Sequence, residues 1–258
     1  MKKKLLGSLL IVSGINAFAS NCPPSANELC DYSYGTFYHL NNVFGINAVG
    51  VSNFASFSNQ SQLGGTNANG LGLGGEAYLS ILLTNGIWIN NDILYVNYLG
   101  AGNYAADQAN YTLKVGYGFQ PIYDYWQITP YIVGGLGAGQ LNWDNQINYG
   151  VGAGLKTEVA FTTRNSLYVD YNYQYIIQGS SFTNSFNNQF NTVATSINNP
   201  IQQTAEIGFK HVFDCSVSMQ VYYKNIQDTT GFMINNATNN YTNNSQIFGI
   251  GVNWYIGN

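Results

Sequence analysis

Residues 167–177 alternate between two kinds of side chain. Every second residue from Leu167 to Ile177 is apolar or aromatic, and the polar residues Asp170, Asn172 and Gln174 lie between them. Because successive side chains of a β-strand point to opposite faces, this period of two predicts a strand with one apolar and one polar face. The same alternation recurs at residues 149–161, 205–213 and 248–256. The chain is therefore predicted to be all-β and antiparallel.

The polar faces of these strands carry most of the charged residues, mixed with glycines. This arrangement favours a barrel with lipid outside and a polar lumen inside, although a soluble β-sandwich with an apolar core remains the structural alternative. Opposite charges in a confined lumen must pair, because isolated buried ions are costly. We therefore expect a lumen charge network formed by Glu76, Lys114, Lys156, Glu158, Asp170, Glu206, Lys210 and Lys224.

The first residues have the features of a secretory signal peptide. Three lysines at positions 2–4 precede an apolar run that ends at Ile15, and Ala17 and Ala19 form a small-x-small cleavage site. The run is shorter than the roughly 20 residues of a spanning helix. We expect cleavage near Ala19, a periplasmic N-terminal segment at residues 20–42, and a barrel at residues 43–258 of an outer-membrane protein from a Gram-negative bacterium.

The composition fits a membrane barrel better than a soluble domain. No later segment is long and apolar enough for a spanning helix, so a closed barrel is the remaining way to cross a bilayer. Charged residues make up 8 % of the chain, against roughly 25 % in soluble domains. Beyond the signal there are five basic and twelve acidic residues, a formal charge of −7. This balance argues against nucleic acid as a partner.

The alternation and the turn residues predict an up-and-down barrel. We predict ten strands, at residues 43–57, 71–83, 87–99, 110–119, 128–141, 148–162, 166–178, 201–213, 216–226 and 245–256. Long polar loops are expected at 58–70, 179–200 and 227–244, and short turns at 84–86, 163–165 and 214–215. Long loops outside the cell and short turns in the periplasm are usual for such barrels.

Three cysteines follow the signal. Cys22 and Cys30 lie close together in an oxidising compartment, which favours a local disulfide between them. Cys215 falls in a short turn at the same predicted end of the barrel. An exchange of partner, an intermolecular link and an idle thiol are all consistent with its position.

One region resembles a known family. The stretch from Thr129 to Gly139, the stretch from Tyr149 to Lys156, and Tyr171-Asn172-Tyr173 are similar to the small bacterial outer-membrane β-barrel superfamily, which includes the OmpA membrane domain. The resemblance covers mainly residues 110–180 and the last strand. It implies a transmembrane barrel, commonly of eight strands, and as partners the barrel-assembly machinery, outer-membrane lipid and lipopolysaccharide. Members of the family tend to end on an aromatic residue, whereas this sequence ends Ile256-Gly257-Asn258.

No catalytic, cofactor or metal site is predicted. His39 and His211 both map to the periplasmic end, where neither is expected to have a serine or carboxylate partner, and Asp228 is interpreted as a loop carboxylate. The leading hypothesis is a non-enzymatic barrel with a structural role, or one that recognises host or surface ligands through its loops. A narrow channel for small polar solutes is the first alternative. A barrel enzyme acting on lipid or peptide is the second.

Overall fold

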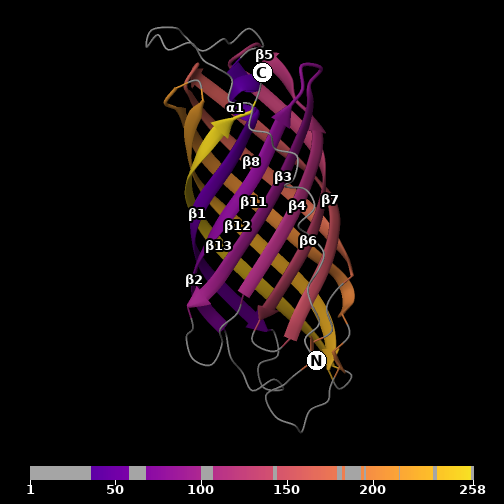
Figure 1. Ribbon diagram of the computed structural model, residues 1–258. Coiled ribbons are helices and arrows are strands. Elements are labelled where there is room, and N and C mark those ends of the chain that lie inside the picture. Colours follow the sequence, from indigo (N-terminus) through magenta and orange to yellow (C-terminus); the bar gives the residue numbers. More distant parts are fainter. Residues whose placement is uncertain are drawn as a thin grey trace, which may run out of the picture.

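The described part of the chain consists almost entirely of β-strands, most of them long (Figure 1). The computed structural model describes residues 36–57, 68–99, 107–141, 144–178, 182–183, 193–194, 196–214, 216–234 and 237–256. Their elements are α1 (Thr36–Asn41), β1 (Val43–Phe57), β2 (Ala68–Leu82), β3 (Ile87–Leu99), β4 (Asp107–Tyr117), β5 (Phe119–Ile122), β6 (Trp126–Leu141), β7 (Asp144–Thr162), β8 (Asn165–Gln178), β9 (Phe182–Thr183), β10 (Val193–Ala194), β11 (Ser196–Val212), β12 (Val217–Ile234) and β13 (Ala237–Tyr255). Within this part of the chain, none of the helical structure has the length and hydropathy needed to cross a bilayer.

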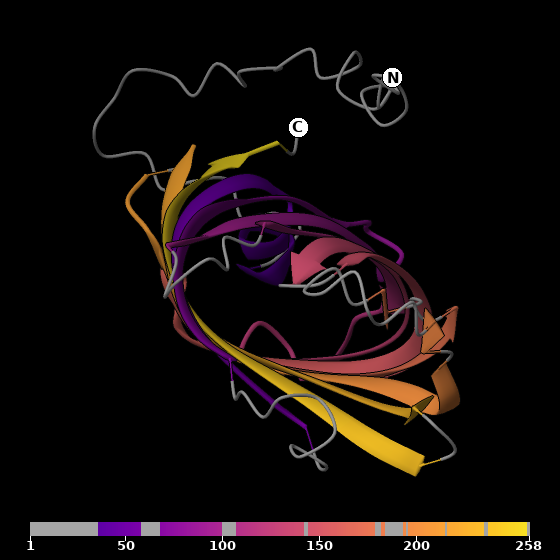
Figure 2. The same ribbon diagram turned by 90° about the horizontal axis from the view of Figure 1, so that it is seen from below.

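Ten strands form a closed antiparallel barrel (Figure 2). The ring runs β1, β2, β3, β4, β6, β7, β8, β11, β12 and β13, and it closes where β13 pairs with β1. The short strand β5 pairs with the beginning of β6, beyond the end of β4. Closure pairs the backbone polar groups of the wall with each other, as hydrocarbon surroundings require. The predicted ten-stranded barrel is confirmed, and the family's usual eight strands do not apply here.

Three strands, β11, β12 and β13, extend at least five residues further than the sequence prediction. The expected long loop at 227–244 is wrong, because β12 continues to Ile234 and β13 already begins at Ala237. Similarly, β11 begins at Ser196, inside the expected loop 179–200. These extensions are rich in Asn and Thr, so they lack the apolar alternation that reveals a strand in a sequence. Backbone hydrogen bonds between neighbouring strands hold them instead.

The apolar side chains face outward and the charged ones inward. On β8, Val169, Tyr171 and Tyr173 are 43–46 % exposed, whereas Asp170 and Asn172 between them are 5 % and 2 % exposed. A water-soluble barrel would have the opposite arrangement. Large apolar residues such as Leu71 and Ile132 are also exposed on the outer surface. The wall is therefore built to contact acyl chains.

The two ends of the barrel differ. The turn end carries the short connections at 83–86, 123–125, 163–164 and 213–216, and the other end, with the long connections, is the loop end. Helix α1 lies at the turn end, within the outline of the barrel in Figure 2.

Helix α1, the described part of the predicted N-terminal segment 20–42, is packed tightly in place. Its Phe37 and Leu40 are 0 % and 2 % exposed. The Thr36 backbone N–H donates to Asp124 Oδ1 at 2.8 Å. Asn42, just after the helix, exchanges two hydrogen bonds of 2.9 Å with the backbone of Leu82. The helix therefore closes the turn end.

Candidate functional site in the barrel interior

Tyrosines opposite glycines bring hydroxyl groups into the lumen. Four inward-facing tyrosines each lie directly opposite a glycine of the neighbouring strand, in the pairs Tyr78–Gly45, Tyr131–Gly154, Tyr168–Gly208 and Tyr222–Gly249. A Cβ added at Gly208 would lie 2.4 Å from the Tyr168 ring, and the other three pairs are equally close. Only glycine leaves room for the ring along the wall. The hydroxyls of Tyr131, Tyr168 and Tyr222 thereby donate to acidic side chains of the interior. The Tyr78 hydroxyl contacts amide oxygens instead.

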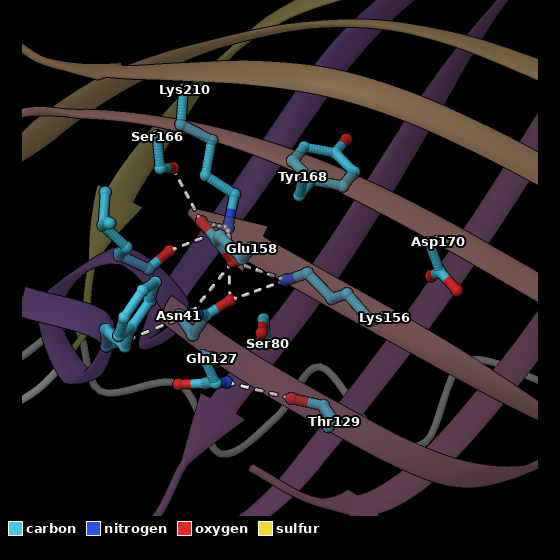
Figure 3. Close-up of polar contacts among 12 residues, drawn as sticks. Asn41, Ser80, Gln127, Thr129, Lys156, Glu158, Ser166, Tyr168, Asp170 and Lys210 are labelled. Carbon is cyan, nitrogen blue, oxygen red and sulfur yellow. Dashed lines mark hydrogen bonds and ion pairs between the residues drawn. The ribbon is translucent and has the colours of Figure 1, made fainter. Parts of the chain in front are cut away.

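The first ionic cluster is centred on Glu158 (Figure 3). The Glu158 carboxylate pairs with Lys156 Nζ at 3.0 Å and with Lys210 Nζ at 3.1 Å, and it accepts a hydrogen bond of 2.7 Å from the Ser166 hydroxyl. Asn41 of α1 joins this cluster, because its Oδ1 accepts from Lys156 at 2.8 Å and from Lys210 at 3.1 Å. The cluster thus ties the helix to the barrel wall.

The second ionic cluster is centred on Lys224 of β12. Its Nζ lies 2.5 Å from Glu76, 3.3 Å from Glu206 and 3.5 Å from Asp92. Glu76 also accepts hydrogen bonds from Asn47 and from Tyr222. Because Asp92 is on β3 and Lys224 on β12, four strands away around the ring, the contact crosses the lumen.

A third ion pair joins Lys114 of β4 to Asp170 of β8 at 2.5 Å, and Tyr131 also donates to Asp170. All eight residues of the predicted lumen charge network therefore lie in the interior, distributed over three groups. Sequence reasoning missed Asp92 and the tyrosines. Asp92 shares the inward face of β3 with Trp88 and Asn90. Its place in the lumen can be recognised only once the register of that strand is known.

Apolar side chains fill the lumen on both sides of the charges. A turn-side apolar cluster comprises Phe37, Leu40, Leu82, Trp88, Tyr131, Val133, Ala160 and Val212. A loop-side apolar cluster comprises Val49, Val51, Leu94, Val96, Tyr98, Tyr168, Tyr222, Ile226 and Ile247. The order is visible along β3, where Trp88 precedes Asp92 and Val96 follows it. The expectation of a polar lumen is thus only partly met.

A small cavity remains among the charged side chains. It measures about 50 Å³ and is lined by groups that include Asp92, Lys114 and Lys210. One water needs roughly 10–15 Å³ of such space, so the cavity has room for roughly three to five waters. It is too small for an organic solute.

The lumen at the loop end is lined by neutral amides and one carboxylate. Gln202 Nε2 donates to Asp228 Oδ1 at 2.8 Å, and Gln174 Nε2 lies 3.3 Å from Gln202 Oε1. Asn53 Nδ2 donates to the Tyr98 hydroxyl at 3.3 Å. The interpretation of Asp228 as a loop residue is wrong, because it lies in β12 on the inward face.

The two histidines lie near the turn end, where His39 precedes Leu40, whose backbone Lys210 contacts, and His211 follows Lys210. The His39 ring is buried and packs 4.3 Å from the Tyr255 ring, and this burial lowers the pKa of His39 to about 4, an effect that nearby Asp214 opposes. The expectation that His39 has no carboxylate neighbour is therefore wrong. Hydrogen bonds from Ser216 lower the pKa of Asp214. His211 Nδ1 lies 2.8 Å from Asn165 Oδ1.

The remaining expectations concern cysteines and metals. Cys22, Cys30 and Cys215 lie outside the described residues, so the disulfide stays a prediction. Among the residues that are described, no group of three or more His, Cys, Asp or Glu side chains is placed to hold a metal ion.

A closed barrel with an apolar outer surface and a polar, side-chain-filled interior is the architecture of small outer-membrane β-barrel proteins, and that prediction is confirmed at the level of the fold. No family model and no curated protein matches the chain. Among solved structures it is similar to the outer membrane protease OmpT from Escherichia coli (TM-score 0.47, 9 % identity, 83 % of this chain and 97 % of that one).

Two further structures are similar to this chain. Neisserial surface protein A has a TM-score of 0.34 and 14 % identity, over 82 % of this chain and 96 % of that one. An outer membrane channel from Pseudomonas putida F1 has a TM-score of 0.42 and 11 % identity, over 81 % and 95 %. Similarities this distant carry no argument about function, which must come from the interior and the loop end.

Proposed function

We propose that the protein is a non-enzymatic, non-conducting barrel of the bacterial outer membrane that has a structural or surface-recognition role. The observation that carries the proposal is the filling of the lumen from the turn end to the loop-side apolar cluster. The loop end, where the long polar connections lie, is then the part that meets ligands outside the cell.

Ion pairs between distant strands support the absence of conduction. Lys224 reaches Asp92 across the lumen, and Lys114 reaches Asp170 three strands away around the ring. Each pair occupies space that a solute would need. Opening the lumen would separate these lysines from their acidic partners. Breaking a buried pair costs about 3–5 kcal/mol. A static lumen is therefore favoured over a narrow channel.

The loop end supports the recognition role. The β12–β13 hairpin extends past the apolar outer surface, and its outward side chains Gln227, Thr229 and Asn244 are polar. The segments 58–67 and 179–195, which connect strands at this end, are also rich in Asn, Ser and Thr. Such hydroxyl and amide groups are typical of adaptable contact surfaces. Lipopolysaccharide and host surface molecules are the proposed ligands, and the barrel-assembly machinery is the proposed partner during insertion.

Planar-bilayer recording tests the absence of conduction. The purified full-length chain, whose folding is checked by faster electrophoretic migration before boiling, should give no steady current steps. A general porin added afterwards to the same bilayer should give steps and serves as the positive control. Steady openings of the chain itself would overturn the proposal in favour of the channel.

Replacement of the loops separates the two proposed roles. In a strain that lacks the protein, the full chain should restore both detergent resistance and binding of surface ligands. A variant with residues 184–192 replaced by a short Gly-Ser linker should keep the detergent resistance and lose the binding. If binding is unchanged in this variant and in one with 59–66 replaced, recognition through the loops is refuted.

A further inference from the structure

The charges of the protein are separated along the barrel axis. Beyond residue 20 the sequence has five Lys and Arg residues, of which four lysines are engaged in the ionic clusters and Arg164 lies in a turn at the turn end. The segments 58–67, 100–106, 142–143, 179–195 and 235–236 contain no Lys, Arg or His. Among the described residues, the loop end therefore contains carboxylates, Asp228 among them, and no Lys or Arg side chain.

Asp228 is an inward-facing carboxylate without a cationic partner among the described residues. It is half-buried, and it accepts hydrogen bonds from Gln202, at 2.8 Å, and from the side chain of Asn243. The nearest lysine on β12 is Lys224, four residues away, which corresponds to about 13 Å along a strand. Lys224 is already bound by Glu76 and Glu206. A carboxylate in this position attracts a cation from outside the chain.

Two buried carbonyl oxygens of the loop end, on β13 and β1, also lack hydrogen-bond partners among the described residues. Asn243 lies directly opposite Asp228 on β13, is 1 % exposed, and has no hydrogen-bond partner for its Oδ1 among the described residues. Asn53, on the next strand, is 4 % exposed and its Oδ1 is likewise unpartnered there, while its Nδ2 donates to Tyr98. Both unpartnered atoms are acceptors. A buried acceptor without a donor is costly, so a ligand that donates hydrogen bonds fits this position.

We propose that the loop end of the lumen binds a primary ammonium group, held between Asp228 and the side-chain carbonyl of Asn243. An ammonium supplies three N–H donors and a single positive charge, which the single carboxylate balances. A divalent cation would keep one uncompensated charge next to the loop-side apolar cluster, where isolated charge is costly. Ile226 of that cluster is the next inward-facing residue to Asp228 on β12 and can pack against the carbon chain of the amine.

The ammonium site names the ligand chemistry of the proposed recognition role. Its biological use rests on that proposed role, whereas its binding can be measured without it. Binding is measured on the full chain in an uncharged detergent, independently of conductance and of loop replacement. The probe is ethanolamine, followed by saturation-transfer NMR at constant ionic strength. Saturable binding is expected, and tetramethylammonium, which has the charge without N–H donors, should bind about ten-fold more weakly or worse.

Variants locate the site. Asp228→Asn keeps the shape and the Gln202 contact but removes the charge, so the dissociation constant for ethanolamine should rise about ten-fold or more. Asp107→Asn, the control, removes one negative charge at the start of β4. It should change the dissociation constant for ethanolamine less than about two-fold, the scale of a screened distant charge. Asn243→Asp places a second carboxylate opposite Asp228 and should create a calcium preference that the natural chain lacks.

Three results would overturn the proposal. They are equal binding of tetramethylammonium and ethanolamine, tighter binding of calcium than of ethanolamine by the natural chain, and unchanged ethanolamine binding in Asp228→Asn that still migrates as a folded barrel. None of these results would bear on the absence of conduction, and steady channel openings would not bear on the ammonium site.

Discussion

Glu158→Leu is expected to destabilise the barrel by about 3–5 kcal/mol, because it leaves two buried lysines without their carboxylate. Glu158 is 1 % exposed, and Lys156 and Lys210 are 7 % and 5 % exposed, so little solvent can replace the lost partner. The substitution also removes the acceptor for Ser166, worth about 1 kcal/mol. The cavity of about 50 Å³, which both lysines line, lets a few waters reach them. The lower half of the range is therefore expected.

A triple variant separates the lost pair from lost packing. Glu158→Leu combined with Lys156→Met and Lys210→Met removes all three charges and keeps similar side-chain volumes. Replacing a complete buried ion cluster by apolar residues is often neutral or stabilising by about 1–4 kcal/mol. The triple variant should accordingly be as stable as the natural chain or more stable. Arg164→Gln, at an exposed turn position, is the matched control and should change stability by less than about 0.5 kcal/mol.

Equilibrium urea unfolding in lipid vesicles, followed by tryptophan fluorescence, measures these differences. The midpoint should fall for Glu158→Leu at an unchanged slope, since the slope reports the surface exposed on unfolding. A loss below about 1 kcal/mol would refute the reasoning that the cluster is buried and strongly paired. A triple variant as unstable as the single one would show that Glu158 matters for its shape and not for its charge.

Two further changes test the wall and the turn end. Gly152→Ala should lower the free energy of unfolding by about 1–3 kcal/mol, because its Cβ would lie 1.9 Å from the Tyr173 carbonyl oxygen. Gly50→Ala, whose Cβ would have no atom within 4 Å, is the control and should be tolerated. Equal unfolding midpoints of the two variants would contradict this. Burial lowers the pKa of His39 from 6.5 to about 4, so the folded state resists protonation of the ring. The free energy of unfolding should therefore be highest above pH 6.5 and should fall by about 3 kcal/mol as the pH drops to 4. His39→Phe should remove this part of the pH dependence in urea titrations, leaving the part due to acids such as Asp214, and an unchanged slope would exclude His39 as its source.

The fold was readable from the sequence where one face of a strand meets lipid. The outward residues of β8 and the inward Asp170 show the alternation at full strength, and the bounds of β1 and β3 match their predicted ranges. The ends of β12 and β13 were not readable. Beyond the bilayer both faces of a strand meet water, so Asn and Thr serve on either side and no period remains.

The site was partly readable. Eight charged residues could be placed in the lumen by the parity of their positions, because each falls on the face opposite to the main apolar face of its strand. Their pairing could not be predicted, since Lys224 reaches Asp92 only when the ring closes. The role of Asn41 was equally hidden, because nothing local shows that α1 enters the barrel.

The sequence alone determined that this chain is a membrane barrel with an apolar outside and charges inside, because the direction of each side chain follows from counting along a strand. The tertiary structure alone decided that the lumen is closed, which acids meet which lysines, and that no described lysine or arginine reaches Asp228. These outcomes depend on distances between residues far apart in the chain. Such distances are set by the register of all ten strands around the ring, which local preferences do not encode.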